Sequence, residues 1–374
     1  MLRSTRTLTA VAVAIGALAS TIHLSAQGFQ PETVFVMTND ADRNEVVAYQ
    51  ASSSGQFYEA NRFSTEGRGS GGTVDPLSSQ GSLTLSPDHS VLYAVNAGSG
   101  TVSVFSIHHS WLTLVDKIKA GGSQPVATAQ WGNVVYVLSS GGSGSIVPFR
   151  YGWDGLKEIP NSTVFLSNSR VSGASLTVSN DGKYLVATEI ISGLIDIFPI
   201  NANGTLGSLT SLHSPGPGVF SAQFAPEGAL IVSETGAAGA TNGSAISSYT
   251  VSKGTLTAIS QSVPTLGAAN CWNAITPNGK WVYASNAGTS TISGFAIGST
   301  GSLTPIGTTI VATNPQGATN LDIAVSGDGK FLFTLNTGAG SIGVFAIQKD
   351  GTLLSTGDVS GLPQSAGLNG IAAL

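Results

Sequence analysis

The sequence has 374 residues, of which 41% are hydrophobic, 9% are charged and 48 are glycine. Its 15 basic and 20 acidic residues give a net charge of −5, and no run of Lys or Arg occurs. This balance argues against nucleic acid and anionic membrane surfaces as partners, because both are bound through clusters of basic residues. The many Gly, Ser and Thr residues and the lack of helix-forming stretches predict an all-β protein with many tight turns.

The first 26 residues have the pattern of a secretory signal peptide. Arg3 and Arg6 form a basic start, residues 8–18 an apolar core, and residues 24–26 a cleavage site. The apolar run is shorter than the about 20 residues of a membrane-spanning helix. We therefore expect a secreted or periplasmic protein with no membrane partner after cleavage. Removing residues 1–26 takes away two basic residues and no acid, which leaves 13 against 20 and a net charge of −7.

Cys271 is the only cysteine. It excludes an internal disulfide and a cysteine-based zinc site. With no histidine near it in sequence to activate the thiol, we expect it to be a small buried apolar residue.

A repeated unit is the strongest signal along the chain. Clear copies span 81–107, 271–297 and 320–347, and weaker ones span 125–150, 174–200 and 221–251. Each contains an apolar strand, a turn such as Asn-Asp-Gly, a second strand, a Gly-rich turn and a third strand, followed by a hairpin arm. The third strand carries an aromatic residue in every unit: Tyr49, Phe105, Phe149, Phe198, Tyr249, Phe295 and Phe345.

These seven units of four short strands predict a seven-bladed β-propeller. The first unit begins at residues 33–40 without an innermost strand, and residues 367–374 remain after the last unit. We expect this C-terminal strand to complete the first blade and close the ring. Residues 27–374 are then a single domain without a linker, and we expect a monomer.

The ends of the second strands align in one polar column: Asn39, Asn96, Ser139, Glu189, Glu234, Asn286 and Asn336. Asparagine has a structural explanation there, because it bonds nearby backbone and tolerates left-handed conformations. Glu189 and Glu234 do not fit that explanation. They lie in neighbouring blades, so we predict that they meet at the channel mouth as a catalytic acid and base. Alternatively they hold a divalent cation among Asn oxygens, or are two solvated acids. No other cofactor is expected.

The starts of the innermost strands define a second set of candidate ligand-binding residues on the same face. Ser221, Trp272 and Asp322 belong to it, together with Ser82 and Ser175. Trp272 either stacks on a flat or sugar-like ligand or plugs the channel, and the plug is the preferred interpretation.

Two loops that lead into this face carry arginines, Arg68 and Arg170. Either could bind a carboxylate or phosphate of a small-molecule ligand. The alternative for each is a solvated loop residue.

The stretches SPDHSVLYAVNAGSGTVSVFSI, SNDGKYLVATE and SGDGKFLFTLNTGAGSIGVFAI resemble lactonase-type seven-bladed propellers. That family includes 6-phosphogluconolactonase-like and 3-carboxymuconate-lactonizing proteins, and the resemblance spans residues 33–374. It implies a site Glu at Glu234 and an acid at Glu189. The family histidine is replaced by Ser221, the adjacent arginine by Phe220, and a second histidine by Ser175.

Two hypotheses follow. In the first, an exported lactonase-like enzyme hydrolyses or forms a small carboxylated or sugar-derived lactone, with Glu234 and Glu189 as acid and base. In the second, an exported propeller without catalysis binds a ligand or a protein partner. An open, acid-lined mouth favours the enzyme, and a mouth sealed by Trp272 favours the binding protein.

Overall fold

The computed structural model describes residues 32–52, 55–167 and 172–374. The predicted signal peptide lies outside these residues. Pro31–Leu374 form one compact unit. All the regular secondary structure of the described residues is β-strand. The described residues contain no helix that is long and apolar enough to cross a membrane.

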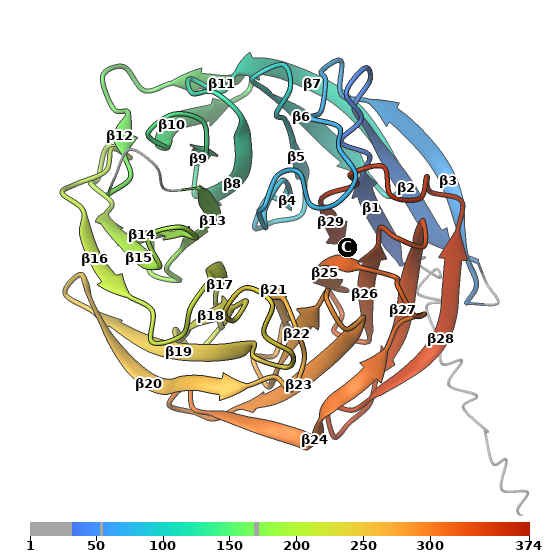
Figure 1. Ribbon diagram of the computed structural model, residues 1–374. Helices are drawn as coiled ribbons and strands as arrows, with labels where there is room; N and C mark the ends of the chain where they lie inside the picture. The colour runs from blue at the N-terminus through green and yellow to red at the C-terminus, as the bar shows by residue number, and fades with distance from the viewer. Residues whose placement is uncertain (1–31, 53–54, 168–171) are drawn as a thin grey trace, which may run out of the picture. The chain divides into compact units, whose positions relative to one another are not determined.

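The strands of the described residues form seven antiparallel sheets around a central channel, as predicted (Figure 1). Each sheet is one blade, and its strands follow one another from the channel outward. The first blade contains β1 (Thr33–Met37), β2 (Glu45–Ala51) and β3 (Phe57–Ser64) together with the C-terminal strand β29 (Ile371–Ala373). The second contains β4 (Leu83–Leu85), β5 (Val91–Asn96), β6 (Thr101–His108) and β7 (Trp111–Lys119).

The third blade has a fourth strand in two pieces, both paired with the same neighbour. It contains β8 (Pro125–Trp131), β9 (Val134–Ser139), β10 (Ser145–Gly152), β11 (Gly155–Glu158) and β12 (Val164–Phe165). The fourth blade contains β13 (Gly173–Val178), β14 (Tyr184–Glu189), β15 (Leu194–Pro199) and β16 (Thr210–His213).

The last three blades are regular. The fifth contains β17 (Val219–Phe224), β18 (Leu230–Glu234), β19 (Ala245–Ser252) and β20 (Thr255–Pro264). The sixth contains β21 (Asn270–Ile275), β22 (Trp281–Asn286), β23 (Thr291–Ile297) and β24 (Leu303–Thr313). The seventh contains β25 (Asn320–Val325), β26 (Phe331–Asn336), β27 (Ser341–Ile347) and β28 (Leu353–Ser360).

The C-terminal strand closes the ring, which confirms the prediction. β29 pairs with β1, with Val34 opposite Ala373 and Val36 opposite Ile371. Leu368 and Ile371 are buried in the same apolar cluster as strands of the first and seventh blades. The first blade is therefore assembled from both ends of the described chain.

The aromatic residue of each third strand is buried, with at most 2% of its surface exposed. Each one lies opposite an aliphatic residue of the second strand; examples are Leu92 with Phe105 and Leu332 with Phe345. Such cross-strand pairs stabilise a sheet and fill the space between blades. The repeat that is visible in the sequence is thus the repeat of the core.

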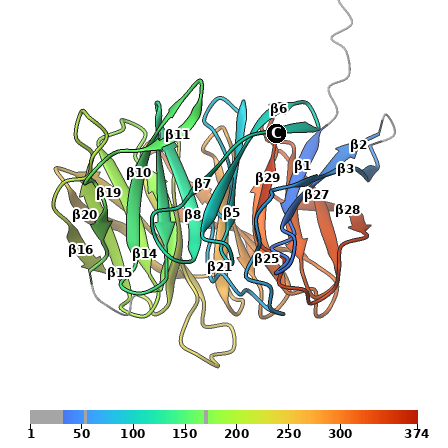
Figure 2. The same ribbon diagram turned by 90° about the horizontal axis from the view of Figure 1, so that it is seen from above.

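Because consecutive strands are antiparallel, the connections alternate between two faces of the ring, which Figure 2 shows from the side. We call the face with the turns between first and second strands the turn face. The opposite face has the ends of the second strands and the segments that join one blade to the next, and we call it the connection face.

Five innermost strands contain a β-bulge close to their start on the connection face. An extra residue at a bulge changes the direction in which its side chain points. In the seventh blade the extra residue is Asp322, whose φ of 57° lies in the left-handed region.

Candidate functional site

The polar column at the ends of the second strands lies between blades. Asn96 is buried, and its Nδ2 donates to Thr101 Oγ1 (3.1 Å) and Ser103 Oγ (2.9 Å) on the third strand. Ser103 Oγ in turn donates to the carbonyl of Thr65, which belongs to the connection from the preceding blade (2.6 Å). Asn286 repeats this arrangement in the sixth blade.

This arrangement corrects the interpretation of the asparagines. Only Asn39 of the four has a left-handed φ, 50°. Its side chain accepts from the N–H of Ser70, which lies in the connection to the next blade and not in the following turn. Asn96 and Asn286 instead join the second strand to hydroxyls of the third. In the second and sixth blades the column therefore links the blade to the connection from the preceding blade.

Glu189 occupies the equivalent position in the fourth blade and is buried. Its Oε1 accepts from the N–H of Ser167 and its Oε2 from the hydroxyl of Ser167, both at 2.7 Å. The hydroxyl of Ser192 also donates to Oε2. Asp196 lies seven residues after Glu189, as Ser103 does after Asn96, and its side chain is close enough to influence the titration of this carboxylate.

The two acids of this pair titrate in opposite directions. Burial raises the pKa of Asp196 to about 8, and the neighbouring carboxylate of Glu189 adds to this increase. Burial alone would raise the pKa of Glu189, but hydrogen bonds from Asp196, Ser167 and Ser192 outweigh it and lower that pKa. Asp196 is thus the protonated member at neutral pH and Glu189 the ionised one.

Glu234 takes the same position in the fifth blade and is also buried. Its Oε1 accepts from Ser214 Oγ (2.7 Å), Ser247 Oγ (2.8 Å) and the N–H of Gly216 (3.2 Å). Its Oε2 has no hydrogen-bond partner among the described residues. It borders a hollow of about 320 Å³ on the connection face, which also includes Ser262.

The structure does not bring Glu189 and Glu234 together as an acid–base pair. Each is bonded to serines of its own blade and of the connection that precedes it. Neither lines the central channel. The prediction placed them at the channel mouth because the ends of the second strands share a face, but their side chains point between blades.

The connection face of the channel is closed by the segment between β3 and β4. Residues 75–81 of this crossing segment run over the innermost strands of several blades (Figure 1). The N–H of Gln80 donates to the carbonyl of Ala174 (2.9 Å), and Ser79 Oγ donates to that of Val126 (2.9 Å). Asn369 Nδ2 donates to Asp75 Oδ1 (3.0 Å).

Trp272 completes this closure. It is fully buried, and its Nε1 donates to the carbonyl of Ser79 in the crossing segment (2.9 Å). Its ring meets that of Phe220 edge to face, with 5.1 Å between centroids. Because the indole ring is fully buried, neither of its faces can stack on a ligand. Trp272 therefore plugs the channel, which is the interpretation that the sequence favoured.

Two further predicted residues lie in the same buried region. Ser221 is fully buried and its hydroxyl accepts from Asn273 Nδ2 (2.8 Å). Cys271 is buried, and that burial raises the pKa of its thiol well above the usual value. Neither has access to solvent on the connection face.

The channel is open toward the turn face instead. It is a hollow of about 430 Å³ lined by all seven innermost strands, β4, β8, β13, β17, β21, β25 and β29. Gln80, Ser175 and Asp322 are buried at its base, whereas Leu85, Gln130 and Phe224 are partly exposed toward the mouth. The sequence-based prediction had placed the channel opening on the connection face, which is the face where the channel is closed.

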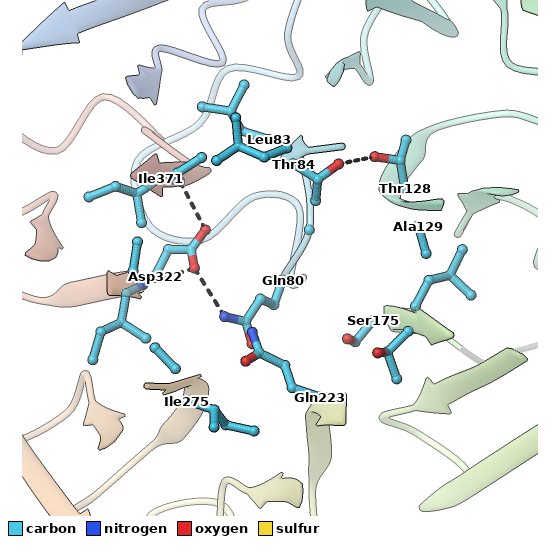
Figure 3. A pocket seen from close by; sticks show the side chains of 18 of the residues that line it. Gln80, Leu83, Thr84, Thr128, Ala129, Ser175, Gln223, Ile275, Asp322 and Ile371 are labelled. Carbon is cyan, nitrogen blue, oxygen red and sulfur yellow. Dashed lines mark hydrogen bonds between the residues drawn. The ribbon is translucent and has the colours of Figure 1, made fainter. Parts of the chain in front are cut away.

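Asp322 is the acid of the channel. Its Oδ1 accepts from the N–H of Ile323 (2.9 Å) and from Gln80 Nε2 (3.4 Å), and its Oδ2 from the N–H of Ile371 (3.2 Å). Burial raises its pKa to about 7. Figure 3 shows Asp322 and Gln80 at the base of the hollow, with the side chain of Gln223 directed toward Gln80.

The rest of the lining is neutral. Among the described residues that line the channel there is no Lys, Arg or His. Thr84 and Thr128 bond each other through their hydroxyls. Within the sheets each innermost strand is paired on one side only. Gln80 and Gly81 bond part of the inner edges of β13 and β8, and the rest of these edges presents peptide N–H and C=O groups to the channel.

The predicted arginines do not contribute to this hollow. The side chain of Arg68 is exposed on the connection face, where its backbone bonds the β5–β6 turn. Arg170 lies outside the described residues. Within those residues, no group of three or more His, Cys, Asp and Glu side chains is placed to bind a metal ion.

Sequence reasoning missed Gln80, Gln223 and Asp196. Gln80 lies in a long connection whose path across the ring is not visible in the sequence. Asp196 could have been found, because it takes the place of Ser103 and Ser293 in the aligned repeats.

The fold and the closed ring define the class of protein, a seven-bladed β-propeller with a channel open on one face. The model of the family described as "Lactonase, 7-bladed beta-propeller" matches residues 112–361. The chain therefore belongs to this lactonase propeller family. A comparison with curated proteins gives no match.

Solved structures show the same fold at low identity. A candidate 6-phosphogluconolactonase from Bacteroides uniformis has a TM-score of 0.71 and 19% identity, covering 92% of this chain and 100% of its own. The periplasmic gluconolactonase of Pseudomonas aeruginosa has a TM-score of 0.67 and 16% identity, covering 92% and 99%. Hydrazine synthase of Kuenenia stuttgartiensis, with a TM-score of 0.58, 19% identity and coverage of 83% and 94%, shows how widely the fold is used.

Proposed function

We propose that this protein is a ligand-binding propeller whose site is the central channel, entered from the turn face. Its ligand is a small, uncharged, polyhydroxylated molecule such as a neutral sugar or sugar lactone. The observation that carries this proposal is the channel lining, which combines side-chain amides, hydroxyls and free strand edges with no basic residue. Its volume of about 430 Å³ falls in the range of small-molecule sites.

The charge of the lining selects against anionic ligands. A phosphorylated or carboxylated lactone would enter without a cation to pair with, and an unpaired buried charge is costly. Asp322, protonated over part of the neutral range, can donate to a ligand oxygen as well as accept. Neutral hydroxyl groups match both Asp322 and the amide of Gln223, which is partly exposed in the channel.

The test is a calorimetric titration with D-glucose, D-glucono-1,5-lactone and 6-phosphogluconate. We expect one of the neutral compounds to bind and the phosphorylated compound not to bind. Gln223→Leu, inside the channel, should weaken that binding at least fivefold. Gln56→Leu, an exposed residue of the β2–β3 turn, is the matched control. Preferential binding of 6-phosphogluconate would refute the proposal.

Lactone hydrolysis is a second candidate, favoured by one observation. Glu234 Oε2 and Ser262 Oγ are buried without partners beside the 320 Å³ hollow. Glu234 could take a proton from water as the water oxygen bonds to the lactone carbonyl carbon. The proton would then pass to the ring oxygen as the ring C–O bond breaks.

Hydrolysis of D-glucono-1,5-lactone above its spontaneous rate tests this second candidate. Glu234→Gln should abolish the excess rate. Glu189→Gln should retain it, because both oxygens of Glu189 are already engaged by Ser167 and Ser192. A wild-type rate equal to the spontaneous one rejects hydrolysis of this lactone.

We also propose that the chain is exported and cleaved after Ala26. Mass spectrometry of the mature protein should then find a start near Gln27. Recovery of intact Met1 from an exported fraction would contradict it.

A further inference from the structure

A second hollow adjoins the open end of the channel. It has a volume of about 600 Å³ and lies on the turn face, where the β13–β14 and β17–β18 turns face each other. It extends outward to the end of β19 and to Ser299 and Thr300 of the β23–β24 turn. We call it the turn-face groove.

The groove and the channel share one wall. Phe224, the last residue of β17, lines both hollows and is partly exposed. The two hollows are therefore adjacent at this residue. A ligand long enough to occupy both hollows would contact Phe224.

The walls of the groove are fixed by hydrogen bonds between blades. Asn180 Nδ2, in the β13–β14 turn, donates to the carbonyls of Ala225 (2.7 Å) and Pro226 (3.0 Å) in the next blade. Ser179 Oγ donates to Asp181 Oδ1 (2.8 Å), which holds the turn in shape. The groove is therefore a preformed feature of the two turns.

The chemistry of the lining matches that of the channel. Tyr184 and Phe224 offer partly exposed rings, and Thr250, Ser299 and Thr300 offer hydroxyls. The described lining contains no Lys, Arg or His. Aromatic faces contact the C–H faces of sugars, while hydroxyls and carboxylates bond their OH groups.

The two acids of the groove favour a neutral ligand over a cationic one. Hydrogen bonding to Lys183 lowers the pKa of Asp181 to about 2, and the ion pair measures 2.8 Å. The charge of Asp181 is thus balanced within its own turn, which leaves Glu227 as the single unbalanced acid. One exposed carboxylate is a good acceptor for hydroxyl groups and a weak site for a polycation.

We propose that the channel and the turn-face groove form one extended site for a neutral oligosaccharide. One end of the chain occupies the channel, and the following sugar units cross Phe224 into the groove. This inference rests on the proposed function of the channel and adds the polymeric nature of the ligand.

The experiment compares D-glucose with cellotetraose and maltotetraose by calorimetric titration of the full mature protein. We expect one tetrasaccharide to bind at least tenfold more tightly than glucose. Glu227→Ala, which changes the groove alone, should reduce that preference at least fivefold while leaving glucose binding within twofold. Phe224→Ala, which changes the wall shared with the channel, should also reduce the preference at least fivefold. Because Phe224 packs against buried residues, the Phe224→Ala protein is also checked by thermal unfolding. Glu227 is exposed, so Glu227→Ala tests the groove without disturbing the core.

Matched controls come from the same face. Trp153, 98% exposed in the β10–β11 turn, and Glu158, exposed on β11, lie away from both hollows, so Trp153→Ala and Glu158→Ala should keep the preference. If glucose binds and neither tetrasaccharide binds more tightly, the extended site is refuted and the channel proposal stands. If none of these sugars or D-glucono-1,5-lactone binds, both fail. Tighter binding of tetralysine than of the tetrasaccharides would also overturn the inference.

Discussion

Glu234 and Glu189 differ from their aligned asparagines in sequence but share their structural position. Each accepts hydrogen bonds from serine hydroxyls of its own blade and of the incoming connection. Asn96 and Asn286 instead donate hydrogen bonds to Thr and Ser hydroxyls of the third strand. A carboxylate can replace the amide there because the surrounding hydroxyls donate as readily as they accept. A departure from a repeat pattern is therefore insufficient evidence of a catalytic residue.

The two glutamates should respond differently to the same substitution. Glu189 accepts at both oxygens, so Glu189→Gln places an amide donor against the Ser167 and Ser192 hydroxyls and against Asp196. We expect a loss of about 1–3 kcal/mol of unfolding free energy. In Glu234→Gln the amide can take the place of the unpartnered Oε2, so the loss should stay below about 1 kcal/mol. Urea unfolding of both variants measures this, and equal losses would contradict the assigned hydrogen bonds.

The buried acids make stability depend on pH. Folded Asp196 keeps its proton up to about pH 8, whereas the unfolded chain loses it near 3.8. The folded state thus binds the extra proton between these values, and its contribution to stability falls as the pH rises through that window. Burial raises the pKa of Asp322 and of Asp75 to about 7, which adds to the fall.

Asp196→Asn should flatten this dependence. The amide donates permanently to Glu189 and its oxygen can still accept from Ser211, so the fold is kept. The slope between pH 5 and 7 should decrease by up to about 1.4 kcal/mol per pH unit, the value for one proton. Unfolding titrations at several pH values test it, with the exposed Asp42→Asn as the control. An unchanged slope would show that Asp196 does not hold the proton.

At the scale of the element, the connections between blades contain glycines that pack directly against side chains of the polar column. A Cβ on Gly67 would lie 2.2 Å from Cγ of Asn96, and one on Gly267 would lie 2.3 Å from Cγ of Asn286. On Gly216 it would lie 2.3 Å from Oε2 of Glu234. The same close approach thus recurs in the second, fifth and sixth blades.

Gly67→Ala should therefore destabilise the protein by about 1–3 kcal/mol, because the buried amide of Asn96 has no space to move. Gly152→Ala is the matched control, since its Cβ would meet only a side-chain oxygen of Asp154 at 3.4 Å and its φ is not positive. Thermal unfolding compares the two. A Gly67→Ala protein as stable as the control would show that the connection can shift.

At the scale of the whole molecule, the sequence predicts the repeated strands of the blades, but it does not predict the path of a segment that occurs only once. The third-strand aromatics and the unmatched residues 367–374 were sufficient to predict seven blades and their closure. The open end of the channel was predicted on the wrong face, because residues 75–81 cross the channel on the connection face and a connection has no periodicity from which to infer its path. The β-bulges likewise leave no pattern, so the direction of Asp322 could not be predicted.

Closure of the ring should account for a large share of the stability. Deleting residues 367–374 exposes the inner edge of β1 and removes Leu368 and Ile371 from the cluster between the first and seventh blades. Loss of two buried aliphatic side chains alone costs about 3–6 kcal/mol, and an opened ring also leaves two blade faces incompletely covered. Deleting only Leu374 keeps the pairing of Val34 with Ala373 and should cost far less. Thermal and urea unfolding of the two truncations decide the matter, because similar midpoints for both would mean that the ring does not depend on β29.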